Sequence, residues 1–228
     1  MRENDAVKVS LDTNVWEAVF DPNDRSYESL RLALHAGAVE GFICAAGFRI
    51  EAVRKSDRLA YFARPKSSFG FEGLEGRDGQ TPTSFGPTDH LHPGLPEKQS
   101  VKFTLAIRTG LKLMRGMNWM GLPSPNQIAE QHLYAAEPPE GVSQRELRQA
   151  ELMQEIPDQN IGRAAFEALG GWNFSPGNMA DAKKFQKACA EWSDAELVAA
   201  HIAYRHDILC TNDQAKGTGK SIFDGDRR

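Results

Sequence analysis

Two short apolar runs, one toward each end of the chain, constrain the fold most strongly. Residues 42–46 read Phe-Ile-Cys-Ala-Ala, and residues 208–211 read Ile-Leu-Cys-Thr. Strands with almost no polar face are typical of parallel sheets that are covered on both sides. An alternating run at residues 7–11 precedes them, and helix-like stretches lie in between. We therefore predict an α/β fold with a central parallel sheet flanked by helices.

The middle of the chain has a different pattern. Residues 65–100 are rich in glycine and proline and have no periodicity, which predicts a long loop. Residues 101–186 read as several helices, among them 101–117, 143–156, 161–169 and one starting near Asn178. Ser143 and Glu146 form a capping-box pattern at the start of the second of these. We interpret residues 65–186 as a large, mostly helical insertion between two halves of one core, residues 1–64 and 187–228.

Composition and charge limit the function only loosely. The chain has 27 basic and 31 acidic residues, a net charge of −4, which is not typical of a nucleic-acid-binding protein. Clustered carboxylates would contribute to this negative charge, and bound divalent cations would reverse the local field. No apolar stretch approaches the ~18 residues of a membrane span, so we expect a cytoplasmic protein without a membrane partner. Cys44, Cys189 and Cys210 show no metal-type spacing, which predicts free thiols.

Two aspartates follow predicted strands directly. Asp12 comes after residues 7–11, and Asp213 comes after residues 208–211. Ligand sites in open α/β sheets lie beyond the carboxyl ends of parallel strands, so we expect both side chains at the same edge of the sheet. Small polar residues accompany them: Thr13, Asn14 and Asn212. Carboxylates brought together repel one another unless a cation compensates them, and Mg²⁺ and Mn²⁺ prefer such all-oxygen ligands.

Two further acids occupy predicted helices. Glu51 lies in the first turns of a helix expected over residues 48–59. Asp194 belongs to a Ser-Asp-Ala-Glu sequence at 193–196, a second capping-box pattern that predicts a helix start there, with Asp194 in the first turn. Taken alone, Asp194 could simply be favoured by the helix dipole, and Glu51 could be a solvated surface residue. Their position in the chain relative to Asp12 and Asp213 favours a shared site.

The order of these acids resembles the PIN-domain family. In that family an aspartate followed by Thr/Ser-Asn closes the first strand, a glutamate lies in the helix after the second strand, an aspartate opens a late helix, and another aspartate follows the next strand. The resemblance covers roughly residues 5–62 and 188–224. It implies a PIN-like three-layer core and a metal-dependent endoribonuclease that hydrolyses RNA with one or two Mg²⁺ or Mn²⁺ ions. The implied catalytic and metal-binding residues are Asp12, Glu51, Asp194 and Asp213, assisted by Thr13, Asn14 and Asn212.

Several alternatives stay open at this stage. The chain resembles VapC-like toxins in its acids, which implies an antitoxin protein as partner, but the 65–186 segment is longer than in small family members. A homodimer is a further expectation. The second function considered is a PIN-like nucleic-acid-binding scaffold without catalysis. Candidate contacts to nucleic acid are Arg49, Arg54, Lys216 and Lys220, and Asp224 is a candidate additional acid.

Overall fold

A four-stranded parallel sheet forms the centre of the molecule. The computed structural model describes residues 6–21, 23–53, 57–62, 97–120, 122, 134–156, 162–174 and 178–213. The strands are β1 (Val7–Leu11), β2 (Val39–Cys44), β3 (Lys112–Met114) and β4 (Ile208–Cys210), in the order β3-β2-β1-β4. All neighbouring pairs are parallel. The predicted α/β class with a central parallel sheet is confirmed.

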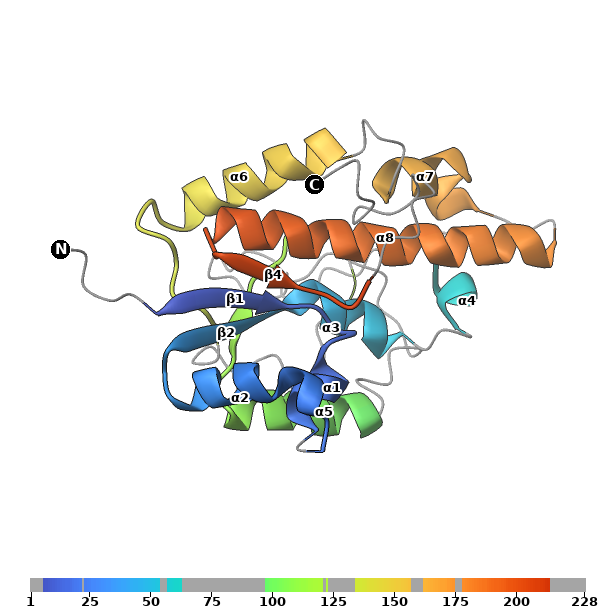
Figure 1. The fold of residues 1–228 in the computed structure, drawn as a ribbon. Helices are drawn as coiled ribbons and strands as arrows, with labels where there is room; N and C mark the ends of the chain where they lie inside the picture. The colour runs from blue at the N-terminus through green and yellow to red at the C-terminus, as the bar shows by residue number, and fades with distance from the viewer. Residues whose placement is uncertain are drawn as a thin grey trace, which may run out of the picture.

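Helices cover both faces of this sheet (Figure 1). One face carries α1 (Trp16–Phe20), α2 (Glu28–His35) and α5 (Glu97–Arg108). Along the other face runs α8 (Met179–Ala203), with α6 (Val142–Glu155) packed on its outer side. The shorter helices α3 (Ala45–Ala52), α4 (Arg58–Phe62) and α7 (Arg163–Ala168) also contact α8. Two 3-10 helices, Arg25–Tyr27 and Gly171–Asn173, complete the described helices.

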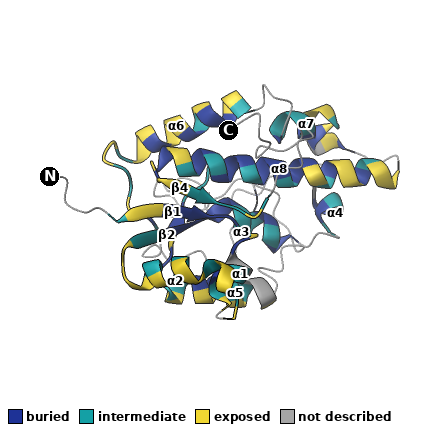
Figure 2. Cartoon of the chain, viewed as in Figure 1, coloured by how far each residue is buried: buried dark blue, intermediate teal, exposed yellow. Residues whose placement is uncertain are grey.

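The alternation of side chains along β2 explains how the two helical layers attach. Ile43 packs with α1 and α5, whereas Phe42 and Cys44 pack with α8, because successive side chains of a strand point to opposite faces. A further cluster, which includes Phe166 and Phe185, fills the space between α8, α7 and α6. Figure 2 shows the result: α8 is buried over much of its length, while the outer faces of α2 and α6 are exposed.

Part of the expected insertion belongs to the sheet. The helix predicted over 101–117 ends at Arg108, and Gly110, with a φ of +84°, turns the chain into β3. Phe103 of α5 and Leu113 of β3 pack in the same cluster as Val9 of β1. Within the segment interpreted as an insertion, residues 97–114 therefore contribute a covering helix and an edge strand to the sheet. The periodicity of the segment could not reveal this, because a three-residue strand is too short to show a pattern.

Helix α8 begins much earlier than the capping-box pattern at residues 193–196 predicts. The start predicted near Asn178 is confirmed: the Asn178 side chain accepts hydrogen bonds from the backbone N–H groups of Ala180 and Asp181. The start predicted at 193–196 is wrong, because those residues lie inside a continuous helix of 25 residues, about 37 Å long. The capping box predicted at 143–146 is also wrong, since α6 begins after Gly141 with no side-chain cap.

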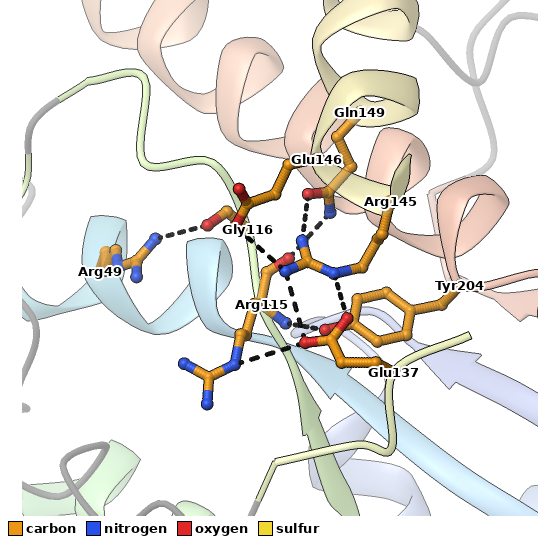
Figure 3. A network of polar contacts seen from close by, with 8 residues as sticks. All are labelled: Arg49, Arg115, Gly116, Glu137, Arg145, Glu146, Gln149 and Tyr204. Atoms are coloured by element: carbon orange, nitrogen blue, oxygen red, sulfur yellow. Dashed lines mark hydrogen bonds and ion pairs between the residues drawn. The ribbon is translucent and has the colours of Figure 1, made fainter. Parts of the chain in front are cut away.

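Buried Arg145 belongs to a network of polar contacts that connects α6 to the loop after β3 and to the end of α8 (Figure 3). Arg145 is only 2% exposed, and its guanidinium donates to the carboxylate of Glu137 and, at 2.7 Å, to Oε1 of Gln149. The same group lies 5.2 Å from the ring centre of Tyr204, the residue that follows α8. Gln149 in turn donates to the carbonyl of Arg115, just after β3, at 2.8 Å. A buried cation needs such a set of partners, so this network fixes α6 against both β3 and the end of α8.

Two further findings concern the helices and the cysteines that the structure describes. None of these helices is long and apolar enough to cross a membrane. The three cysteines are free thiols: Cys44 and Cys189 are buried, and Cys210 is partly buried. Burial raises the pKa of Cys44 and of Cys189 to about 12, so both stay protonated at neutral pH.

Candidate functional site

A small pocket lies at the carboxyl end of β1 and β2, beside the middle of α8. Its volume is about 60 Å³, and its polar wall is formed by Asp12 after β1, Glu51 on α3, Arg58 on α4 and Asp194 on α8. The apolar part of the wall consists of Leu11, Cys44, Ile50 and Leu197. This is the edge of a parallel sheet at which α/β proteins bind ligands. Three of the four predicted acids therefore line one pocket.

Asp12 is held rigidly at the end of β1. It is 4% exposed, and its backbone N–H donates to the carbonyl of Cys210 at 3.0 Å. One carboxylate oxygen accepts a hydrogen bond from the backbone N–H of Thr13, and the other accepts one from Oγ1 of Thr211 at 2.7 Å. Both oxygens are thus oriented by the loops that follow β1 and β4. Burying a carboxylate is costly unless its oxygens are hydrogen-bonded, and both oxygens of Asp12 are.

Asn14 and Asn212 tie the two strand-end loops together. Oδ1 of Asn14 accepts from the backbone N–H of Asn212 at 2.8 Å, and Nδ2 of Asn212 donates to the carbonyl of Asn14 at 3.1 Å. Nδ2 of Asn14 donates to Thr211 at 3.2 Å, and the hydroxyl of Tyr27 donates to Asn212. The predicted auxiliary residues thus make protein contacts that position Asp12. Of these residues, Thr13 also lines the pocket.

Negative charges converge on Asp194. Burial raises the pKa of Asp194 well above its ordinary value, and the carboxylates of Asp12, Glu191, Asp213 and Glu51 raise it further. The other three predicted acids are therefore within electrostatic reach of Asp194. Glu191, nearly one turn earlier on α8, is a fifth acid that the sequence pattern did not single out. When carboxylates cluster without a compensating cation, their repulsion suppresses the ionisation of one member of the cluster. The raised pKa of Asp194 is an effect of this kind.

Glu51 is paired with a basic residue that the sequence analysis did not place in the site. The single helix predicted over residues 48–59 is broken: α3 ends at Ala52, Val53 is extended, and α4 begins at Arg58. The break folds Arg58 back over the end of α3, where Nη2 lies 3.1 Å from Oε1 of Glu51. No proline or glycine marks this break. The one local signal is Ser-Asp at 56–57, residue types that favour helix caps.

Other predicted residues lie apart from the pocket wall. Asp213 follows β4, and its backbone N–H donates to Thr211 at 3.0 Å, so it influences the pocket through its charge. Arg49 points toward the loop after β3, where Nη1 donates to the carbonyl of Gly116 at 3.4 Å (Figure 3). Arg54, Lys216, Lys220 and Asp224 lie outside the described residues.

The chemistry of this site fits a hard divalent cation. Its donors are carboxylate oxygens, the ligands that Mg²⁺ and Mn²⁺ prefer, and a cation would remove the repulsion that raises the pKa of Asp194. Within the residues that the structure describes, no three His, Cys, Asp or Glu side chains stand close enough to enclose a metal ion. Asp12, Asp194 and Asp213 would have to approach one another, with water completing the ligand shell.

The fold and the site together define an α/β protein with an acidic pocket at the carboxyl edge of a parallel sheet. Comparisons with family models, with curated proteins and with solved structures gave no match to this chain. The residues of the pocket and the chemistry that they allow therefore indicate the function.

Proposed function

We propose that this protein is a Mg²⁺- or Mn²⁺-dependent ribonuclease of the PIN type that hydrolyses phosphodiester bonds of RNA. One observation carries the proposal: Asp12, Glu51 and Asp194, from distant parts of the chain, line one pocket at the carboxyl edge of the sheet, and the charges of Asp12, Asp213 and Glu51 repel that of Asp194. Repulsion of this kind destabilises the protein, so a cluster without a ligand has no structural benefit. A cation-binding role accounts for it.

The residues divide into ligands and positioning residues. Asp12, Asp194 and Asp213 are the proposed metal ligands, and Glu51 joins them directly or through water. Thr13, Asn14, Thr211 and Asn212 hold Asp12 in place through the hydrogen bonds described above. When bound, the metal would lower the pKa of a water molecule and stabilise charge on the phosphate. An antitoxin partner and a homodimer stay predictions.

The first test measures RNA cleavage by the purified chain with Mg²⁺, with Mn²⁺ and with a chelator, using a labelled single-stranded RNA. Cleavage should require metal and should be lost in Asp12→Asn. Asparagine keeps the shape of the side chain and one acceptor, so this variant should fold normally. The matched control is Asp181→Asn, at the start of α8 and outside the pocket wall. Undiminished cleavage by Asp12→Asn, or in chelator, would contradict the proposal.

One observation favours the second function, an RNA-binding scaffold without catalysis. Glu51 already has a cationic partner in Arg58, and the donor atoms are not gathered closely enough to hold a metal ion as they stand. A scaffold of this type should bind the labelled RNA with the same affinity in Mg²⁺ and in chelator, and leave it uncut. The ribonuclease should instead bind more tightly in a non-catalytic divalent ion such as Ca²⁺, because the phosphate would then face a cation.

A further inference from the structure

Arg58 is the one basic residue in the pocket wall among the residues that the structure describes. It is 5% exposed, which is unusual for an arginine, and it shares the pocket with Asp12, Glu51 and Asp194. A buried guanidinium in an acidic pocket is either part of the packing or part of the site. Its hydrogen bonds distinguish these roles.

Three hydrogen bonds fix the guanidinium against α3. Nε donates to the carbonyl of Val53 at 3.1 Å, and Nη2 donates to the carbonyl of Ile50 at 3.0 Å and to Oε1 of Glu51 at 3.1 Å. The last carbonyls of a helix have no partner within the helix, so Arg58 serves as their cap. These contacts orient the planar group firmly and use Nε and Nη2 only.

Nη1 carries the remaining donors of Arg58. It has two N–H groups and makes no hydrogen bond to any described residue. Arg58 also lines the pocket. A fixed cation that is nine-tenths buried, lines a cavity and has two donors that no described residue occupies is suited to bind an anion.

We propose that Arg58 binds the phosphate of the substrate, with Nη1 donating to a non-bridging oxygen of the phosphodiester. The inference extends the proposed ribonuclease function, because it supplies what the acids cannot. A phosphate that enters a pocket of carboxylates is repelled, and Arg58 provides a positive charge that is in place before the substrate arrives. Lysine could not do the same, because a single ammonium cannot hold two backbone carbonyls, Glu51 and a phosphate in one plane.

The test compares Arg58→Met, Arg58→Lys and the double variant Glu51→Gln/Arg58→Met with the full-length wild type. Arg58→Met should lower the single-turnover cleavage rate about 100-fold. It should also weaken binding of a short single-stranded RNA in Ca²⁺ about tenfold. Arg163→Met is the matched control, because Arg163 makes a comparable ion pair with Glu167 on the surface of α7. This control should leave both quantities unchanged.

The double variant separates phosphate binding from a structural role. If Arg58 only neutralises Glu51, removing both charges should restore the rise of the thermal midpoint that inorganic phosphate causes in metal-free buffer, a measurement that does not need Glu51 as a metal ligand, and the inference is overturned. If Arg58 binds phosphate, the double variant should show no such rise, like Arg58→Met. Should Arg58→Met fail to fold, Arg58→Lys decides the matter: inorganic phosphate should raise the thermal midpoint of the wild type but not of this variant. An equal rise in both would also overturn the inference.

Failure of the ribonuclease proposal gives a different result. In that case the wild type leaves RNA intact, while binding of RNA and of inorganic phosphate still depends on Arg58. The opposite result is that the wild type and Arg58→Met cleave RNA equally well. This result would overturn the role of Arg58 but would leave the proposed metal-dependent function unaffected.

Discussion

His206 should make the folded protein less stable as the pH falls. This residue precedes β4, is 8% exposed, and its Nδ1 lies 2.9 Å from Oγ of Ser10. Burial, together with the smaller effects of the positive charges of His201 and Lys8, lowers the pKa of His206 to about 3, against the opposing effect of Asp207. His201, whose Nδ1 lies 2.9 Å from the same hydroxyl, also has a lowered pKa because of burial. The folded state therefore keeps His206 neutral.

The size of the effect follows from the two pKa values. In the unfolded chain His206 binds a proton near 6.5, whereas in the folded protein it does so only near 3. Between these values the unfolded state holds more protons, so the free energy of unfolding decreases as the pH is lowered. At pH 5.5, roughly one unit below the unfolded pKa, this group alone should cost about 1.4 kcal/mol relative to pH 7.5. The contribution of neutral His206 to the free energy of unfolding is fully present at pH values above 6.5.

The measurement is urea-induced unfolding at pH 7.5 and at pH 5.5 for the wild type, His206→Phe and His35→Gln. Phenylalanine keeps the ring that packs 3.9 Å from Phe42 but does not titrate. The wild type should lose about 1.4 kcal/mol more than His206→Phe between the two pH values. His35, exposed at the end of α2, is the control and should behave as the wild type does. Equal losses in the wild type and His206→Phe would refute this reasoning.

Three further predictions concern α8 and the pocket. Asp194→Asn should raise the thermal midpoint in metal-free buffer at neutral pH, because the raised pKa of this carboxyl means that its ionised form destabilises the fold; Asp181→Asn should not. Gly47→Ala should cost about 1–3 kcal/mol in unfolding experiments, because a Cβ there would lie 2.5 Å from Cγ2 of Thr13. Adding Thr13→Ser, which removes that methyl group, should restore stability, and no restoration would contradict the steric explanation. Asn178→Ala should lower the free energy of unfolding by about 1 kcal/mol through loss of the α8 cap, whereas Asn178→Asp should be nearly neutral.

The edge of the sheet could be predicted because the relevant signals are local. An apolar run followed by an aspartate appears at both β1 and β4, and parallel strands bring their carboxyl ends to one edge. That rule is enough to place Asp12 near the loop that holds Asp213, although the two lie near opposite ends of the chain. The start of α8 was also predictable, because Asn178 is a strong cap that precedes a long helical run.

Tertiary contacts decide the features that could not be predicted. Asp194 looks like a helix-start residue, but the preceding helix is stabilised by Phe185 and Trp192 packing against α7, so the chain is already helical there. The break between α3 and α4 has no proline or glycine, and Arg58 stabilises it by capping carbonyls that the break exposes. Strand β3 is too short for a pattern and is fixed by pairing with β2.

The position of β4 beside β1 has a consequence for biosynthesis. β1 leaves the ribosome early, but its neighbour β4 and the Thr211 hydroxyl that orients Asp12 are made much later. Until then one edge of β1 has no partner and the carboxylate of Asp12 lacks the hydrogen bond from Thr211. Pairing over such a long stretch of chain is slow to form. The proposed ribonuclease therefore could not cut RNA while its own message was being translated through the first three strands, and the proposed cleavage would begin only once β4 had docked.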